Sequence, residues 1–119
     1  MTYVDGFLLA VPKARLEEYK ELARKGKEVW MEHGALSYVE AMGDDVPYGE
    51  LTSFPRAVQA KDDEIVIFAW VTYESREARD RIMKKVMEDP RLAKMMDPAN
   101  MPFDMSRMAW AGFKPIVEA

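Results

Sequence analysis

The sequence predicts an α+β fold of the ferredoxin-like type, a β-α-β-β-α-β chain whose antiparallel sheet carries two helices on one face. Two segments have the apolar spacing of amphipathic helices, and four others have the composition of strands. Their order along the chain is that of the split βαβ pattern. Because a chain of 119 residues fits one domain, we expect residues 1–119 to form a single domain.

The first strand and the first helix lie near the N-terminus. Tyr3–Val11 mixes β-branched and aromatic residues with Leu, as strands do, and Pro12 ends it. From Lys13 to His33, apolar or small residues recur at spacings of three and four, which predicts an amphipathic helix ended by Gly34. The residues of this stripe are Leu16, Tyr19, Ala23, Gly26 and Trp30. A glycine in such a stripe is tolerated where the helix backbone passes close to a sheet or a ligand.

Two further strands are separated by a long connection. Leu36–Met42 is the second predicted strand, and Glu64–Tyr73 is the third. The third is apolar at nearly every position, which favours a central strand covered on both faces. The polar connection between them, Gly43–Asp63, is longer than most loops, so we expect either a lid over a pocket or an arm that contacts a second copy.

The C-terminal part supplies the second helix and the last strand. Ser75 is an N-cap residue for a helix that runs to Glu88, and a short helical turn follows over Arg91–Met96. Arg107–Val117 is the last predicted strand. Pro115 indicates that this strand lies at an edge of the sheet.

The face of the sheet opposite the helices needs a cover. The stretch Ile65–Tyr73 offers apolar side chains to both faces, whereas two helices cover only one. A second copy, packed sheet against sheet, would cover the other face. We therefore predict a homodimer that forms a dimeric α+β barrel.

Composition excludes several classes of partner. The net charge is −4, with 21 acidic and 17 basic residues, so the basic footprint of a nucleic-acid-binding protein is missing. No apolar run is long enough to span a membrane, and the short run Phe7–Val11 lacks the basic residues of a signal peptide. The sequence contains no cysteine, which fits a reducing compartment. We expect a cytoplasmic protein that binds neither nucleic acid nor membranes.

No pattern in the sequence indicates a metal ion or a cofactor. Glycine-rich phosphate loops, the G-x-S-x-G elbow and the H-E-x-x-H motif are all missing from it. Seven of the ten methionines fall between Met83 and Met108. Thioethers are ligands for Cu(I), but no cysteine or histidine accompanies them, so adaptable packing or a flexible ligand lid is the better interpretation. We predict no cofactor and no metal site.

Two titratable residues are candidates for catalysis. His33 is the only histidine and lies one turn after Trp30 at the end of the first helix, where it is either a general base or a capping or core residue. Glu40 shares one face of the second strand with Tyr38, and that face points either into a pocket or into water. Asp5, within the first strand, needs a basic partner such as Arg107.

Aromatic residues on several elements predict a binding pocket. Trp30, Trp70 and Trp110 lie on three different elements that should converge. Aromatic walls with a few polar groups are typical of small-molecule sites, although large aromatic residues also simply fill cores. The predicted binding residues are Trp30, Tyr38, Phe54, Trp70, Phe103, Arg107 and Trp110.

Several separated motifs resemble the YbaA-like family, a small bacterial family catalogued as domain of unknown function 1428. The motifs are Asp5-Gly6-Phe7, Trp30-x-x-x-Gly34-Ala35-Leu36, Phe54-Pro55, Arg79-Asp80, Asp89-Pro90-Arg91, and Met101-Pro102-Phe103-Asp104 with Arg107-Met108. The resemblance covers essentially the whole chain. It implies membership of the dimeric α+β barrel superfamily, which includes cofactor-free monooxygenases, haem-handling enzymes and plain ligand-binding modules. It implies no particular reaction.

Two functions are therefore expected. The first is a homodimeric module that binds a small apolar or aromatic ligand in an aromatic-lined pocket. The alternative is a cofactor-independent, monooxygenase-like enzyme with His33 as the general base. A structural dimer without a ligand is a third hypothesis, which a pocket too small for a ligand would favour.

Overall fold

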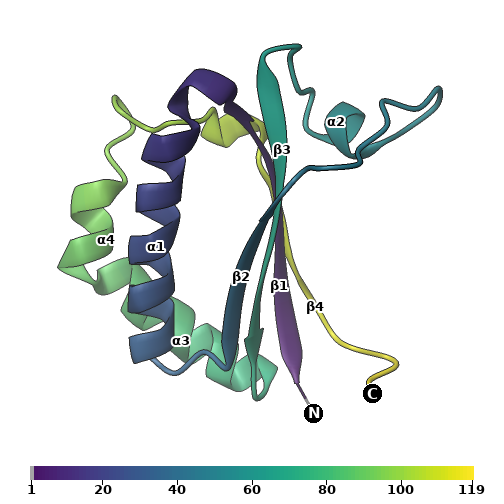
Figure 1. Ribbon diagram of the computed structural model, residues 1–119. Coiled ribbons are helices and arrows are strands. Elements are labelled where there is room, and N and C mark those ends of the chain that lie inside the picture. The colour runs from purple at the N-terminus through teal and green to yellow at the C-terminus, as the bar shows by residue number, and fades with distance from the viewer. Residues whose placement is uncertain (1) are drawn as a thin grey trace.

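The structure is a computed structural model that describes residues 2–119. A four-stranded antiparallel sheet in the order β2-β3-β1-β4 carries α1, α3 and α4 on one face, while α2 lies on the other side (Figure 1). In chain order, the elements are β1 (Tyr3–Pro12), the 3-10 turn η1 (Lys13–Arg15), α1 (Leu16–Glu32), β2 (Ser37–Met42), α2 (Phe54–Ala57), β3 (Glu64–Tyr73), α3 (Arg76–Glu88), α4 (Pro90–Met95), the 3-10 turn η2 (Met105–Arg107) and β4 (Ala109–Phe113). The predicted ferredoxin-like α+β fold is confirmed.

The strand register explains which strands are central. β1 pairs with β3 from Tyr3–Tyr73 to Pro12–Glu64, and with β4 from Val4–Phe113 to Leu8–Ala109. β2 pairs with the other side of β3. The prediction that β3 is central and the last strand lies at an edge is therefore confirmed.

The largest differences between the predicted segments and the structure lie in the last strand and in the long connection. The sequence predicts the last strand over Arg107–Val117, but it covers only Ala109–Phe113, and Arg107 belongs to the turn before it. The strand ends before Pro115, which has no N–H to donate to a neighbouring strand. The connection Gly43–Asp63 contains the short helix α2, whose N-cap Ser53 accepts a hydrogen bond from the Arg56 N–H.

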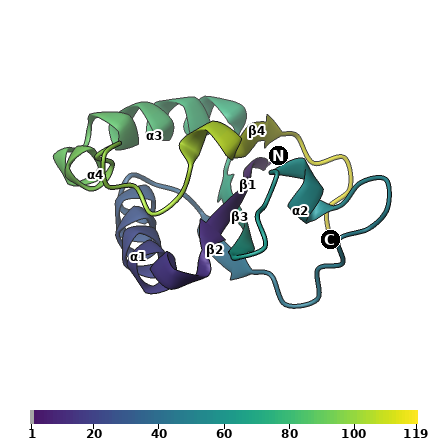
Figure 2. The same cartoon turned by 90° about the horizontal axis from the view of Figure 1, so that it is seen from above.

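The two faces of the sheet differ in how well they are covered. On the helix-facing side, Tyr73, Val71 and Ile67 of β3 are buried in the core beneath α1 and α3. On the opposite side, Phe68 of β3 is 46% exposed and Phe113 of β4 is 58% exposed. The segment around α2 extends from this open face, away from the three other helices (Figure 2).

Candidate functional site

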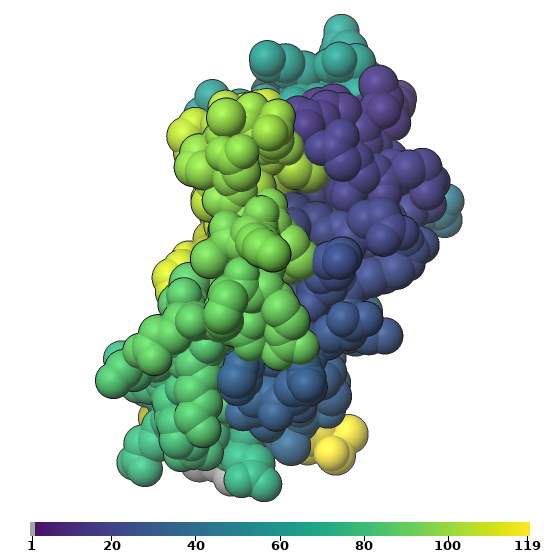
Figure 3. Space-filling model, turned by 90° about the vertical axis from the view of Figure 1, so that its left-hand side faces the viewer, coloured from purple at the N-terminus to yellow at the C-terminus, as the bar shows by residue number. Residues whose placement is uncertain are grey.

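A cavity of about 410 Å³ lies between the sheet and the helices that cover it. α1 runs beside α3 and α4 over this face of the molecule (Figure 3). The wall is almost entirely apolar. Its aromatic residues are Phe7, Tyr19, Trp30, Tyr38, Phe103 and Trp110, and its methionines are Met83, Met87, Met96, Met101, Met105 and Met108.

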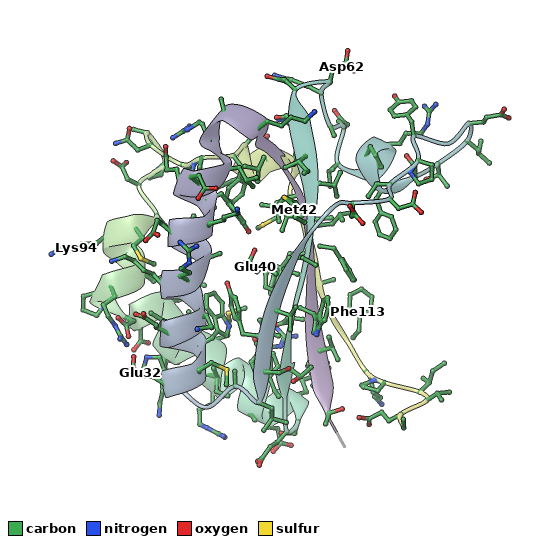
Figure 4. All side chains as sticks on the ribbon, viewed as in Figure 1. Glu32, Glu40, Met42, Asp62, Lys94 and Phe113 are labelled. Atoms are coloured by element: carbon green, nitrogen blue, oxygen red, sulfur yellow. The ribbon has the colours of Figure 1, made fainter. Side chains whose placement is uncertain are left out.

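One carboxylate interrupts this apolar wall. Glu40 and Tyr38 are alternate residues of β2, so their side chains share the helix-facing side of the strand. The Tyr38 hydroxyl donates a hydrogen bond of 2.6 Å to Glu40 Oε2, and the hydroxyl of Tyr19, from α1, donates to Glu40 Oε1. Glu40 lies in the space between β2 and α1 (Figure 4). We call these three residues the Glu40 triad.

Both phenols of the Glu40 triad remain hydrogen-bond donors. Burial raises the pKa of Tyr19 and of Tyr38 far above the usual value of a phenol, and the neighbouring Glu40 carboxylate raises it further. The two hydroxyls therefore stay protonated over the whole physiological range. Glu40 is consequently an acceptor held by two neutral donors.

Gly26 of α1 makes room for the triad. A Cβ atom at this position would lie 2.9 Å from the Tyr38 hydroxyl oxygen, closer than real Cβ contacts allow. The helix glycine thus lets the strand tyrosine approach the helix backbone, as the sequence predicts for a glycine inside the buried stripe.

A second, outer cleft of about 250 Å³ adjoins the triad. Tyr19, Tyr38 and Glu40 line both spaces. The outer cleft also has three basic side chains from α1, which are Lys20, Arg24 and Lys27. The triad therefore separates an apolar interior from a basic surface cleft.

Another carboxylate, that of Asp5, is fully buried behind the cavity wall. The Trp30 indole N–H donates to the Tyr73 hydroxyl at 3.1 Å, and that hydroxyl donates to Asp5 Oδ2 at 2.8 Å. Arg79 Nε lies 3.7 Å from Asp5 Oδ1, an ion-pair distance. Burial raises the pKa of Asp5, while the Tyr73 hydrogen bond and the Arg79 charge oppose that rise. This chain of contacts fixes the Trp30 ring in the cavity wall.

Five of the predicted site residues come together at the cavity. They are Trp30, Tyr38, Glu40, Phe103 and Trp110. Sequence reasoning assigns Tyr19 only to a buried stripe and does not connect it with Glu40. Tyr73 carries no signal that singles it out. Arg79 belongs to the motif Arg79-Asp80, and it is the basic partner of Asp5 in place of Arg107.

The other four predicted residues lie away from the cavity wall. Trp70 packs against Phe68 on the open face, with ring centroids 5.4 Å apart, and Phe54 packs on the same Phe68 at 6.0 Å. Arg107 forms two hydrogen bonds, of 2.8 and 2.7 Å, with Glu64, and these keep the pKa of Glu64 below its usual value.

His33, the fourth of them, joins the end of α1 to the start of α4. Its Nε2 lies 3.0 Å from Asp89 Oδ2, and Asp89 also accepts from the Arg91 backbone N–H at the beginning of α4. Hydrogen bonds from Arg91 and then from His33 hold the pKa of Asp89 far below its usual value. This is the structural role that the sequence leaves open beside a role in catalysis.

Within residues 2–119, no group of three or more His, Cys, Asp or Glu side chains has the arrangement of a metal site. In the same part of the chain, no helix is both long and apolar enough to cross a membrane. The candidate site is therefore the apolar cavity with its single carboxylate.

The sheet order and the helices on one face define a ferredoxin-like α+β fold with a ligand-sized cavity between the sheet and the helices. The sequence profile of a family described as protein of unknown function (DUF1428) matches residues 2–105. The uncharacterized protein YbaA of Escherichia coli strain K12 is 43% identical over 118 residues, which cover 99% of each chain. The chain belongs to this family.

Several solved structures of low sequence identity have a similar fold. An uncharacterized NIPSNAP domain protein from Burkholderia xenovorans has a TM-score of 0.62 at 11% identity, over 98% of this chain and 97% of that one. A dimeric ferredoxin-like protein from an uncultured marine organism has a TM-score of 0.59 at 10% identity, over all of both chains. SnoaB, a cofactor-independent oxygenase from Streptomyces nogalater solved as a point mutant, has a TM-score of 0.56 at 12% identity, over 98% and 93%. Because the sequence identities are this low, the three matches show a similar fold and carry no information about function.

Proposed function

We propose that this protein is a homodimeric module that binds a small, largely apolar molecule in the cavity between the sheet and α1, α3 and α4. The observation that carries the proposal is a cavity of about 410 Å³ with apolar walls and one carboxylate held by two phenols. Binding sites for small molecules have volumes of roughly 300–1,000 Å³ and just such a contrast of apolar walls with few polar groups.

The open face of the sheet supports the homodimer. Phe68 and Phe113 are half-exposed on this face, and Val39 of β2 lies on the same side. A second copy would bury these side chains, and one structural neighbour is described as dimeric. The connection Gly43–Asp63 fits an arm better than a lid, because Phe54 packs on Phe68 at the open face and not over the cavity.

Native mass spectrometry tests both halves of the proposal. The purified protein is expected at twice 13.7 kDa, with an added mass that disappears on denaturation. Phe68→Glu should give monomers because it places a charge within the apolar interface. Met31→Glu, at an exposed position of α1, is the matched control and should remain dimeric. A wild-type monomer at micromolar concentration would contradict the dimer.

An enzyme of the cofactor-independent oxygenase type is the second candidate. One structural neighbour has that activity in its description. Glu40 is a better placed general base than His33, since Glu40 lies on the cavity wall and His33 is paired with Asp89. Once the retained molecule is identified, aerobic incubation followed by mass spectrometry separates the two functions. A binder returns the molecule unchanged, whereas an oxygenase adds oxygen, in a reaction that Glu40→Gln stops and His33→Ala does not.

The proposed setting is the cytoplasm, without a nucleic-acid partner. The absence of cysteine from the sequence and its net charge of −4 support this part of the proposal.

A further inference from the structure

The polar groups of the cavity wall are arranged to accept hydrogen bonds. Both phenol hydrogens of the Glu40 triad are already donated to Glu40. The carboxylate and the two phenol oxygens still have free lone pairs. The Trp30 N–H is donated to Tyr73, and Trp110 carries the other indole N–H of the wall, at its half-exposed rim. Close to Glu40, a ligand therefore meets acceptors.

The wall also lacks a positive charge. Among residues 2–119, those that line the cavity include no Lys, Arg or His. A ligand carboxylate placed beside Glu40 would bring two anions into contact, which is a costly arrangement. A ligand that donates a hydrogen bond to Glu40 would instead complete the network.

The surroundings of Glu40 indicate whether the hydrogen-bond donor of the ligand is neutral or positively charged. Lys20, Arg24 and Lys27 line that cleft, on the far side of the same carboxylate. An ammonium group would lose its hydration in the apolar cavity, which costs more than for a hydroxyl group. Lys27 adds a positive charge beside the same carboxylate, whereas Lys20 and Arg24 are paired with Glu17 and Glu21. The charges around the triad thus favour a neutral donor.

We infer that the ligand is a neutral, mainly apolar molecule that carries a hydroxyl group and donates it to Glu40. This inference rests on the proposed function and names the class of molecule bound at that site. The six aromatic and six methionine side chains of the wall suit an aromatic body, because thioethers and ring faces pack well on aromatic rings.

Four probes of one shape test the inference by calorimetry at pH 7 with the wild-type protein. They are 2-naphthol, 2-methoxynaphthalene, 2-naphthoate and 2-naphthylmethylamine. The naphthol should bind at least about ten-fold more tightly than each of the others, since only it offers a neutral donor. Equal binding of 2-methoxynaphthalene would overturn the hydroxyl donor, and tighter binding of the acid or the amine would overturn the neutral charge.

These outcomes separate the inference from the proposed function. If all four probes bind alike, the cavity is a binding site and the inference about the hydroxyl is wrong. If none binds, the proposed function fails, and the inference fails with it.

Two variants test whether Glu40 is the group that accepts the hydrogen bond from 2-naphthol. Glu40→Gln replaces the carboxylate with a neutral amide, which is a weaker acceptor and also offers an N–H to the ether oxygen, so the preference for naphthol over its methyl ether should fall several-fold. Glu28→Gln, at an exposed position of α1, is the control and should keep the preference. A Glu40→Gln protein that folds and keeps the preference would contradict the assignment. If Glu40→Gln does not fold, the wild-type series still decides the inference.

Discussion

Asp5 and Glu40 are two carboxylates on the same face of the sheet, and their surroundings differ. Asp5 has no exposed surface, and its partners are one phenol and the Arg79 guanidinium. Glu40 has two phenols, and within residues 2–119 no basic side chain forms an ion pair with it. Asp5 stands behind the cavity wall, whereas Glu40 is part of it.

This difference separates a structural carboxylate from a binding one. A buried anion whose charge is balanced inside the protein links the elements that supply its partners, here β1, β3 and α3. An anion held by neutral donors at the edge of a cavity keeps acceptor capacity for a ligand. Mutations at the two sites should therefore affect different properties.

The largest effect is expected from Arg79→Met. Asp5 would then be a fully buried anion without its cation, and the free energy of unfolding at pH 7 should fall by about 3 kcal/mol. Chemical denaturation measures the change. Arg81→Met, at an exposed position of the same helix, should change stability by less than about 0.5 kcal/mol.

The pH dependence of this loss follows from the pKa of Asp5. That pKa is already raised by burial, and removing Arg79 removes a charge that lowers it. A carboxyl whose folded pKa lies above its unfolded value of 3.8 contributes less stability as the pH rises through that window. The deficit of Arg79→Met relative to wild type should therefore be smallest near pH 4 and grow toward pH 7. A deficit that shrinks as the pH rises would contradict this account.

The next largest loss of stability is expected when one tyrosine hydroxyl is removed beside each carboxylate. Tyr73→Phe removes the donor to Asp5 and the acceptor of the Trp30 N–H, both buried, so it should cost about 2 kcal/mol of unfolding free energy. Tyr38→Phe removes one donor to Glu40, which adjoins the outer cleft and can be solvated from it, so it should cost less than about 1 kcal/mol. If thermal or chemical denaturation shows equal losses of unfolding free energy for the two variants, the distinction between a structural and a binding carboxylate is wrong.

Most helices and strands could be predicted from the sequence, because they depend on residues that are close together along the chain. β3 has the predicted bounds Glu64–Tyr73, because its continuous run of apolar residues is typical of a central strand. The cap at Ser75 and the stop at Gly34 are likewise short-range features. α2 escapes prediction because it is only four residues long and lies within a polar connection.

The site was predictable only in part, because it depends on how elements dock. β3 is apolar on both faces, so the sequence could not tell that Trp70 points to the open face and Val71 to the cavity. Tyr19 and Glu40 meet because α1 packs across β2, a contact that neither segment encodes alone. His33 follows the last turn of α1, and its partner Asp89 is 56 residues away in the sequence.

The smallest effect is expected from a substitution at Gly26, which tests whether the position of the Tyr38 hydroxyl in the Glu40 triad affects ligand affinity. Gly26→Ala brings a methyl group against the Tyr38 hydroxyl, so that hydroxyl must shift away from Glu40. The affinity for 2-naphthol should fall by roughly three-fold, which is less than the loss of a whole hydrogen bond. Overall stability should change by no more than about 1 kcal/mol, because Ala is the better helix former by about that amount.

The control for this variant is Lys25→Ala, at the neighbouring exposed position of α1. It also places an alanine in the helix without approaching the triad, and it should leave the affinity for 2-naphthol unchanged. If Gly26→Ala also leaves that affinity unchanged, then the position of the Tyr38 hydroxyl does not govern binding. Glu40 would then differ from Asp5 only in its neighbours, and the distinction between a structural and a binding carboxylate would lose its support.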